Sequence, residues 1–439
     1  MIKISATTGD EVENLVQSDR VHKRLYTDSG IFDLEMDTVF SKAWIFVGHE
    51  SQIPNPGDFF SSQLARQSVL VVRHTDNTIK VFHNRCPHKG TQLTTATSGH
   101  VRVFRCMYHA WSFDTDGSLK ARPLEDGYNG SRLDTNNEDC NLKGVASVES
   151  YRGFVFARLQ SKGPDLASWL GEARTSIDNM VDRSPQGALE VVGQPLKYIN
   201  DCNWKMLVEN VSDNLHALPT HRSASAPAKE MADVINSEDE IPQVLHMLTP
   251  FGSPLSFFEK IGQTICGNGH SFTGGDLSIH SAYPENEEYN QAMLASYGEE
   301  TFQKILSVER HNTVIYPSLS LKCNLQSIRV FRPISVDQTI LETWTFRLKG
   351  APQEMLARSL LYNQTVFSPA SIAGHDDNEA FCRMQQGLKE GGHEWVSLHR
   401  HMETETPNEN GTISAPGTSD ISYRHEYEAW LNYMKTSQE

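Results

Sequence analysis

The sequence predicts an α+β protein in which an all-β domain precedes a larger domain with an antiparallel sheet covered by helices. Three observations support this fold class. Short β-branched segments separated by Asn, Asp and Gly fill residues 42–165, which is typical of an antiparallel β domain. Helical periodicity begins after residue 165. Strand-like segments then return without regular alternation with helices, which favours an antiparallel sheet in the second domain.

The first part of the chain supplies the β domain and a segment that precedes it. Residues 1–41 are polar at first, and DLEMDTVFSKAWIFVGH has the spacing of a helix that leads into a strand. We therefore expect a helical N-terminal segment that packs on the larger domain. The Asp-Gly pair at 116–117 predicts a tight turn. The strands expected in residues 42–165 are SVLVVRH (68–74), TIKVFHN (78–84), VRVFRC (101–106) and RGFVFARL (152–159).

The larger domain, residues 166–439, combines helices with strands. The expected helices are 165–181, 203–217 and 353–367. The expected strands are 314–325, 327–334 and 339–348. Polar, Gly-rich or acidic stretches predict loops at 222–243, 267–290 and 403–422. Two histidines of the second loop, His270 and His280, are expected to be solvated.

Composition excludes several classes of function. The 439 residues carry 39 Lys+Arg and 55 Asp+Glu, a net charge of −16. An acidic protein is a poor general binder of nucleic acid or anionic lipid, because both need a basic surface. No apolar run approaches the roughly 18 residues of a membrane helix. No basic segment followed by an apolar stretch marks a secretory signal, so the expected location is cytoplasmic.

The seven cysteines direct attention to metal binding. An odd number in a large chain without a visible export signal argues against a disulfide framework. Two of them belong to a repeated pattern, because NRCPHKG contains Cys86 and His88, and VFRCMYHAW contains Cys106 and His109. Each half places one thiolate and one imidazole on a short loop.

Two metal sites compete for these four residues. Zinc fingers usually separate a Cys pair from a His pair, whereas each loop here carries one of each. The pattern suits a two-iron cluster in which one iron binds two thiolates and the other binds two imidazoles. The alternative, buried cysteines beside unrelated histidines, does not explain why the pattern occurs twice.

A second group of polar residues follows in ENVSDNLHALPTH. If residues 203–217 form one helix, Glu209, Asp213 and His216 share a face, since their spacing is i, i+4 and i+7. Pro219 would then end the helix, and His221 could approach His216 from the following turn. Two histidines and one carboxylate on one face of an iron form the facial triad of non-haem Fe(II) oxygenases.

The third ligand of such a triad must come from a distant segment. The candidate is SPASIAGHDDNEAF, which contains Asp376 and Asp377. The residues alone give no reason to choose between the two adjacent aspartates. His375 beside them could be a ligand, a substrate contact or a solvated side chain.

Both motifs together resemble a known family. Residues 86–109 resemble the Rieske [2Fe–2S] motif of the large (alpha) subunits of ring-hydroxylating oxygenases, and the similarity extends over roughly 20–400. The resemblance implies a catalytic domain of the helix-grip type and makes Asp377 the iron ligand with His216 and His221. It also implies that Asp213 links His109 of one subunit to His216 of the next, and that Asn210 lies near the open side of the iron.

The resemblance implies an activity and partners as well. Electrons from NAD(P)H would pass through a separate reductase, with or without a ferredoxin, to the cluster and then to the mononuclear Fe(II). The enzyme would use O₂ to hydroxylate an aromatic ring, giving a cis-dihydrodiol or a phenol. It would assemble as a homotrimer or, with a small β subunit, as α₃β₃. Basic residues near the cluster could dock an acidic electron donor; they are Lys89, Arg102, Arg105, Lys120 and Arg122.

Chain length and spacing look most like the benzoate, salicylate and terephthalate branch, so an aromatic acid is the expected substrate. A carboxylate would require a buried Arg, and Arg329 is the candidate. By position in the family, Phe367 and Ala373 are expected to line the pocket. Two alternatives stay open: a Rieske monooxygenase acting on a methoxy, amine or aliphatic C–H substrate, and an electron-transfer protein without the second iron.

Overall fold

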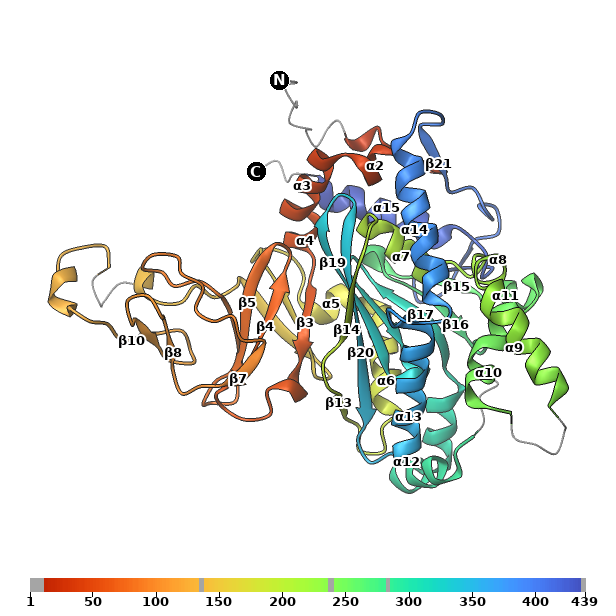
Figure 1. Ribbon diagram of the computed structural model, residues 1–439, viewed down its shortest axis with the longest axis horizontal. Coiled ribbons are helices and arrows are strands. Elements are labelled where there is room, and N and C mark those ends of the chain that lie inside the picture. The colour runs from red at the N-terminus through yellow and green to blue at the C-terminus, as the bar shows by residue number, and fades with distance from the viewer. Residues whose placement is uncertain (1–11, 134–137, 236–240, 282–284, 436–439) are drawn as a thin grey trace. The chain divides into compact units, whose positions relative to one another are not determined.

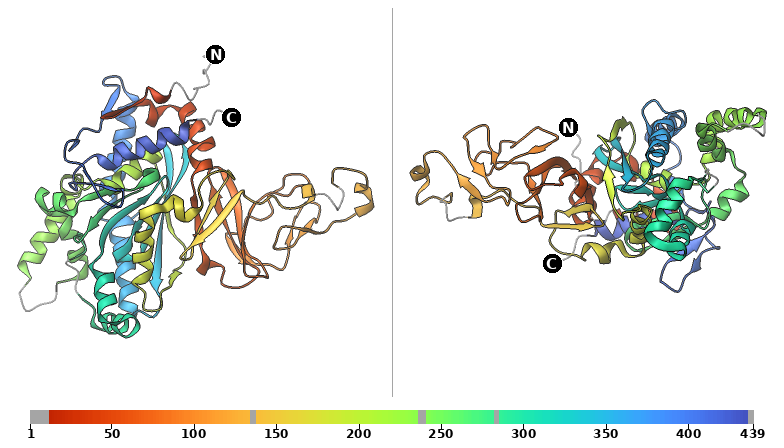
Figure 2. Two further views of the ribbon diagram at one scale, coloured as in Figure 1. Left: turned by 180° about the vertical axis from the view of Figure 1, so that it is seen from behind. Right: turned by 90° about the horizontal axis from the view of Figure 1, so that it is seen from below.

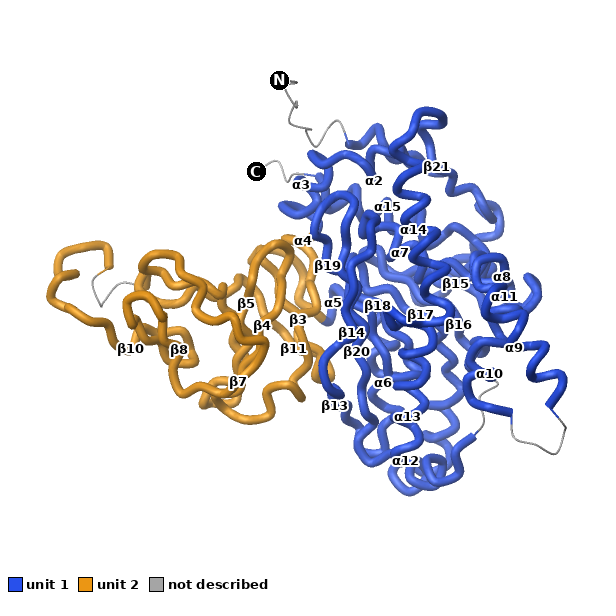
Figure 3. Tube along the Cα trace, in the orientation of Figure 1, with its two compact units in different colours: residues 1–39, 167–439 blue, residues 40–166 orange. Residues whose placement is uncertain are grey.

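The computed structural model describes residues 12–133, 138–235, 241–281 and 285–435 (Figure 1). The chain divides into two compact units, one of residues 40–166 and the other of residues 1–39 with 167–439 (Figure 3). The smaller unit corresponds in sequence to the expected β domain. The N-terminal segment is assigned to the same unit as the larger domain.

The smaller unit contains three antiparallel sheets. One has the order β11-β12-β3, a second β6-β5-β4-β7 and a third β10-β9-β8. The expected strands 68–74, 78–84 and 152–159 correspond to β5, β6 and β12, whereas 101–106 is strand only at β8. The bounds are β3 Ile45–His49, β4 Asp58–Leu64, β5 Gln67–Arg73, β6 Ile79–His83, β7 Ser98–His100, β8 Phe104–Arg105, β9 Ser112–Phe113, β10 Leu119–Ala121, β11 Ser147–Tyr151 and β12 Phe154–Arg158.

An apolar cluster supports the loops of the smaller unit. Trp111 and Phe113 are fully buried, and they belong to one cluster with Cys86 and Cys106. Burying such rings is worth roughly 1.5–3 kcal/mol each. The two cysteine-bearing loops therefore rest on a packed core.

The main sheet of the larger unit is antiparallel with the order β13-β20-β19-β18-β17-β16-β15-β23-β22, in which β14 also pairs with β20. Figures 1 and 2 show helix α13 (Gln353–Tyr362) on one face of this sheet and α6 (Arg174–Asp182) on the other. The strands are β13 Leu189–Val191, β14 Leu196–Asn200, β15 Gln263–Ile265, β16 Ser271–Gly275, β17 Glu309–Ile315, β18 Leu319–Lys322, β19 Ser327–Ser335, β20 Gln338–Leu348, β22 Thr406–Pro407 and β23 Ile413–Ala415. The expected α+β fold, with an all-β domain and a larger domain on an antiparallel sheet, is confirmed.

The helices that matter for the site surround this sheet. A π-helical turn, η8 (Asn363–Phe367), continues α13 directly. The others are α2 Arg24–Thr27, α3 Ser29–Asp37, α7 Trp204–Ser212, α8 Ala217–Thr220, α9 Arg222–Val234, α14 Gly374–Lys389 and α15 Ile421–Met434. No helix in the described part of the chain is long and apolar enough to cross a membrane.

A buried ion pair fixes α7 to the N-terminal helix α3. Lys205 Nζ lies 2.5 Å from Glu35 Oε1, and their side chains are 4% and 0% exposed. The indole N–H groups of Trp204 and Trp430 also donate to the Glu35 carboxylate, each at 2.8 Å. One carboxylate on α3 therefore joins α7 and α15, the helix that carries Trp430.

The three expected loops are in part regular structure. Residues 222–243 begin with helix α9, whose buried face has only the small side chains of Ala224, Ser225 and Ala228. The helix also contains Pro227, which is unfavourable inside a helix, so the sequence of this polar stretch favours a loop. The other two stretches contain β16 and the pair β22–β23, and residues 236–240 and 282–284 lie outside the described residues. The expected solvation of His270 and His280 is wrong, because both are buried.

Candidate functional site

The two cysteine loops of the smaller unit repeat one backbone pattern. In each, the N–H of the cysteine donates to the carbonyl five residues on, and the N–H four residues on donates back to the cysteine carbonyl. The bonds are Cys86 N to Thr91 O at 2.8 Å, Gly90 N to Cys86 O at 3.0 Å, Cys106 N to Trp111 O at 2.8 Å and Ala110 N to Cys106 O at 3.0 Å. Both fourth residues, Gly90 and Ala110, have left-handed φ, 77° and 58°.

The thiols of these loops receive backbone N–H groups. Those of His88 and Lys89 point at Cys86, and those of Tyr108 and His109 point at Cys106. For Cys106, burial raises the pKa, but the hydrogen bonds outweigh it and hold the pKa below its ordinary value. For Cys86, burial outweighs the hydrogen bonds and raises the pKa to about 11, so the feature that both loops share is the donated N–H groups, which a metal-bound thiolate would accept.

The imidazoles complete the arrangement. The rings of His88 and His109 lie 4.7 Å apart, and Trp111 stacks on His88 at 4.9 Å. His88 Nδ1 is buried without a hydrogen-bond partner, whereas its Nε2 lies 3.5 Å from Tyr128 Oη. A buried nitrogen without a partner is costly unless a bound group satisfies it.

A cluster fits these four residues better than a single ion. Ligand atoms around one tetrahedral zinc would lie within about 4 Å of one another. Among the described residues, one group of His, Cys, Asp or Glu side chains brings at least three ligand atoms within 4.8 Å of one another. That group does not include these four residues. The ligands of two irons lie further apart than the ligands of one ion, so the wider spacing of these side chains suits a two-iron cluster.

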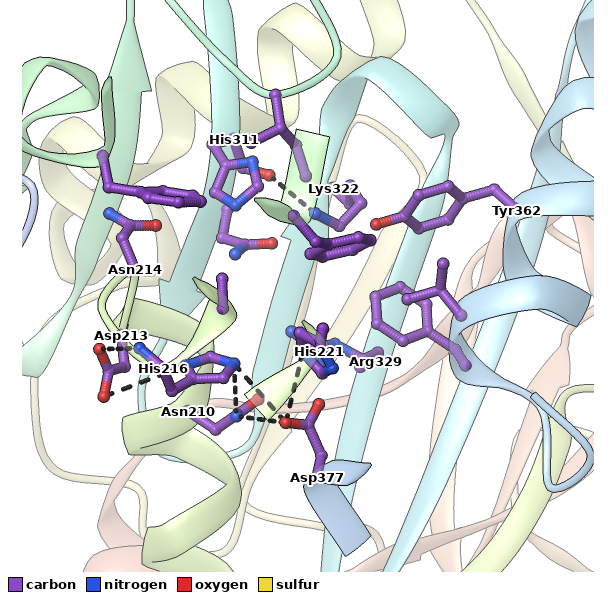
Figure 4. A pocket seen from close by; sticks show the side chains of 17 residues that line it. Asn210, Asp213, Asn214, His216, His221, His311, Lys322, Arg329, Tyr362 and Asp377 are labelled. Atoms are coloured by element: carbon purple, nitrogen blue, oxygen red, sulfur yellow. Dashed lines mark hydrogen bonds and ion pairs between the residues drawn. The ribbon is translucent and has the colours of Figure 1, made fainter. Parts of the chain in front are cut away.

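That compact group consists of His216, His221 and Asp377 in the larger unit. Asp377 Oδ1 lies 3.6 Å from Nε2 of both histidines (Figure 4). Burial lowers the pKa of His221, and Asp377 opposes that effect. Two imidazoles facing one carboxylate oxygen form a donor set that suits a divalent metal.

Helix α7 ends earlier than expected. It stops at Ser212, and Asp213 is its C-cap. The Asp213 Oδ1 accepts the backbone N–H groups of Leu215 and His216, at 2.7 and 3.2 Å, in a local turn that competes with the helix. The prediction that His216 continues the helical face of Glu209 and Asp213 is therefore wrong. A short helix containing Pro219, α8, separates His216 from His221.

Asp213 lies between the triad and a positive charge. Its Oδ2 is 4.0 Å from His216 Nδ1, and its Oδ1 is 3.9 Å from Arg400 Nη2. Arg400 is itself held by Asp420 at 2.5 Å. His216 Nδ1 is buried without a hydrogen-bond partner, so the Asp213 carboxylate lies behind the ring without bonding to it.

The two neighbouring aspartates have different environments. Both stand in the first turn of α14, where the helix dipole favours a carboxylate. Asp376 Oδ2 accepts from Ser223 Oγ at 2.7 Å and lies 3.7 Å from His221 Nδ1, on the side away from the triad. His375 is exposed. The structure therefore brings Asp377, and neither His375 nor Asp376, to the meeting point of the two Nε2 atoms.

Asn210 and Glu209 occupy neighbouring positions on α7 with different surroundings. The Asn210 amide nitrogen lies 3.2 Å from His216 Nε2 and donates to Asp377 Oδ1 at 3.3 Å. Glu209 Oε1 accepts from the hydroxyls of Tyr26 and Tyr427, at 2.7 and 2.5 Å. Burial raises the pKa of Glu209 to about 7, although these hydrogen bonds oppose it.

A pocket opens beside the triad. Its walls come from one face of β17–β19 and from α7, α8, η8 and α14 (Figure 4). Phe367 and Arg329 line it, as expected, but Ala373 is not among the lining residues and is buried in an apolar cluster. The lining residues are Asn210, Asp213, Asn214, His216, Ala217, His221, Phe251, Phe258, Ile279, His311, Asn312, Lys322, Arg329, Tyr362, Val366, Phe367 and Asp377.

Comparison with known proteins assigns both units to families. Residues 43–145 match the Rieske [2Fe-2S] domain, and residues 166–433 match the catalytic domain of the ring-hydroxylating alpha subunit. The toluate 1,2-dioxygenase subunit alpha of Pseudomonas putida is 31% identical over 399 residues, which cover 87% of this chain and 83% of that protein. The chain belongs to the ring-hydroxylating oxygenase alpha subunits.

Further relatives agree with this family. The 2-halobenzoate 1,2-dioxygenase large subunit of Burkholderia cepacia is 29% identical over 406 residues, which cover 89% of this chain and 83% of that protein. The solved structure of naphthalene 1,2-dioxygenase with indole bound has a TM-score of 0.81 at 23% identity, and it covers 98% of this chain and 96% of that chain. The structural likeness supports the fold.

Membership in the ring-hydroxylating oxygenases defines the cofactors. The chain has a Rieske [2Fe-2S] domain and a catalytic domain of the kind that binds mononuclear iron, and a separate reductase supplies electrons in this family. The enzyme is an oxidoreductase of the aromatic-ring-hydroxylating dioxygenase type. The orphaned His88 Nδ1 and the converging Nε2 atoms are observations that fit these groups.

Sequence reasoning missed several pocket residues of the oxygenase, among them His311, Lys322 and Tyr362. Lys322 was detectable in principle, because it ends the apolar alternation of SLSLK and a lysine inside such a strand needs explanation. Which face of the sheet it occupies depends on strand pairing that one sequence does not determine.

Proposed function

We propose that this oxygenase hydroxylates the ring of an aromatic acid. The observation that carries the proposal is the pocket beside the triad, whose apolar walls include Phe251, Phe258 and Phe367 and whose polar wall includes the buried Arg329. Aromatic walls suit a planar ring. Two relatives are named for toluate and 2-halobenzoate, which are aromatic acids.

Different residues of the chain would hold the two metal groups and position the substrate. His216, His221 and Asp377 would hold the mononuclear Fe(II), and Cys86, His88, Cys106 and His109 would hold the [2Fe–2S] cluster. When bound, these groups supply electron transfer and O₂ activation. Asp213, whose carboxylate lies 4.0 Å from His216 Nδ1, would link that ring to His109 of a neighbouring subunit in the assembly. The Asn210 amide lies at the triad and would border the reacting ring.

Partners follow from the same family. We propose a trimer, either of this chain alone or with a small β subunit as α₃β₃, served by a reductase and, in one arrangement, a ferredoxin. Of the five basic residues expected to dock the donor, four are exposed, namely Lys89, Arg102, Arg105 and Lys120. Lys120 pairs with Asp114, and Arg122 is buried beside Trp111, so Arg122 is not part of the docking surface. A cytoplasmic location fits the seven free cysteines.

The alternative monooxygenase function has less support. Solved quaternary ammonium Rieske monooxygenases resemble the chain with TM-scores of 0.66 and 0.68, at 18% and 19% identity, and this likeness concerns the fold. A cationic substrate would meet Arg329 and Lys322 in the pocket, both buried. Like charges in a buried site are unfavourable.

A product assay tests the proposed function. The purified oxygenase, reconstituted with iron and a surrogate reductase, would receive benzoate, salicylate, terephthalate, naphthalene and carnitine with NADH and O₂. We expect oxygenated products from at least one aromatic acid, with about three Fe and two sulfides per chain by metal and sulfide analysis. Oxidation of carnitine alone, or one zinc without sulfide, would contradict the proposal.

A further inference from the structure

Lys322 ends strand β18 and lies in the wall of the pocket with its side chain buried, at 5% exposed for the residue. Two acceptors hold its ammonium group: His280 Nε2 and the carbonyl oxygen of His311, each at 3.3 Å. The ring of Tyr362 lies 5.6 Å from Nζ. An ammonium group has three N–H donors, so one donor remains for the pocket.

No carboxylate in the described part of the chain compensates this charge, since the titratable groups that act on Lys322 are Arg329 and Cys323. The charged neighbour is Arg329, which is also a cation, and burial with that neighbour lowers the pKa of Lys322 well below its ordinary value. A buried unpaired cation is costly, and proteins retain such groups where a ligand supplies the opposite charge.

Arg329 differs from Lys322 because its bonding capacity is already used in part. Its Nε donates to Ser320 Oγ at 3.3 Å, and its guanidinium lies over the Phe367 ring at 4.5 Å. Asp377 is the acid that faces it most strongly. Arg329 therefore serves the triad side of the pocket, close to the carboxylate of the ligand set.

The register of the sheet separates the two cations. Ser320 pairs with Arg329 across β18 and β19, and Lys322 is two residues further along the same face. A diagonal neighbour lies roughly 7–8 Å away across a sheet. In Figure 4, Lys322 and His311 lie on the opposite side of the pocket from His216 and Asp377.

We propose that Lys322 is the carboxylate anchor of the pocket, so that an aromatic acid binds with its carboxylate on Lys322 and its ring toward the triad. The inference rests on the proposed function and deepens it. A carboxylate is chosen over a phenol because only the carboxylic acid is fully ionised near neutral pH. In this orientation the ring carbons presented to His216 and Asp377 are remote from the carbon that bears the carboxylate.

Binding of two matched probes tests the anchor. Benzoate and benzamide have nearly the same shape and differ in charge, and their dissociation constants would be measured anaerobically on the full chain reconstituted with iron. The wild type should prefer benzoate, and Lys322→Met should reduce that preference about 10- to 100-fold. Lys322→Arg should retain most of it, and Lys349→Met, which removes an exposed lysine just after β20, should leave it unchanged.

Thermal unfolding separates a binding role from a structural one. Lys322→Met leaves no buried carboxylate without its partner. It should therefore keep or raise Tm, whereas loss of a structural ion pair would lower Tm. A wild type without preference for benzoate, a preference that survives Lys322→Met, or a marked fall in Tm of that variant overturns the anchor. Failure of the proposed function is a different result, namely benzoate binding that depends on Lys322 without oxidation of any aromatic compound.

Product analysis tests the orientation. The wild type should place new oxygen on ring carbons other than the carboxyl-bearing one, as read by mass spectrometry and NMR of products from ring-labelled benzoate. A diol that includes the carboxyl-bearing carbon would overturn the orientation.

Discussion

Replacing Lys205 by Met should destabilise the larger unit far more than loss of an ordinary surface lysine. Lys205 is 4% exposed and its partner Glu35 is fully buried, with 2.5 Å between Nζ and Oε1. Removing the ammonium leaves a carboxylate in the core with only the Trp204 and Trp430 indoles as partners. Breaking a buried pair in this way costs about 3–5 kcal/mol.

The consequence should reach the metal site because α7 carries both Lys205 and Asn210, and Asp213 is its C-cap. At roughly 2–4 °C for each kcal/mol, the loss corresponds to a fall in Tm on the order of 10 °C. The assay is thermal and urea unfolding followed by circular dichroism, with bound iron measured on the same samples. The double variant Lys205→Met/Glu35→Gln should recover part of the loss, since it removes the orphaned charge as well.

A matched control comes from the exposed pair of Lys389 and Asp337, which has a similar distance of 2.8 Å at 48% and 38% exposure. Lys389→Met should cost at most about 1 kcal/mol, because water screens the pair. If Lys205→Met were no more destabilising than this control, the reasoning about α3 as an anchor of α7 would be refuted.

Three further predictions concern the triad and its surroundings. His216→Ala should lose mononuclear iron, by metal analysis, while the visible absorption of the cluster survives; loss of both would show that the sites are not independent. Asp213→Ala should keep both metal centres but lose most turnover, and product formation coupled to NADH use at the wild-type rate would argue against the linking role. For Glu209, the pKa is raised to about 7 from 4.5. Between pH 4.5 and 7 the folded protein holds this proton while the unfolded chain releases it. The free energy of unfolding should therefore fall by about 3 kcal/mol as pH rises through this window. Urea unfolding at pH 5 and pH 8 measures the change, and Glu209→Gln should lack this contribution; an unchanged dependence in the variant would exclude Glu209 as its source.

The sequence predicts local chemistry better than it predicts local geometry. Cys86, His88, Cys106 and His109 were detectable because each loop carries its ligand pair within a few residues, so spacing alone preserves the signal. The end of α7 was not detectable, because a turn closed by the Asp213 carboxylate competes with continued helix, and their balance depends on tertiary contacts.

Most of the remaining features that the sequence did not predict depend on contacts between residues far apart in the chain. Asp377 meets His216 and His221 across a separation that no local pattern encodes, so adjacent aspartates look equivalent in sequence. Lys322 shares a face with Arg329 through the register of β18 and β19, which only the paired strands define. Helix α9 contains Pro227 and many small or polar side chains, a composition that favours a loop in sequence.

The π-helical turn at Asn363–Phe367 allows the pocket wall to change by insertion or deletion of a residue, which is a kind of change that substitutions do not provide. Such a turn holds an extra residue compared with an α-helical turn, and it places Val366 and Phe367 in the pocket wall. Deleting one residue there would convert the turn to α-helix and rotate the following side chains by about 100°. Insertions and deletions in this turn can therefore reshape the substrate wall without changing the segment that carries His216 and His221.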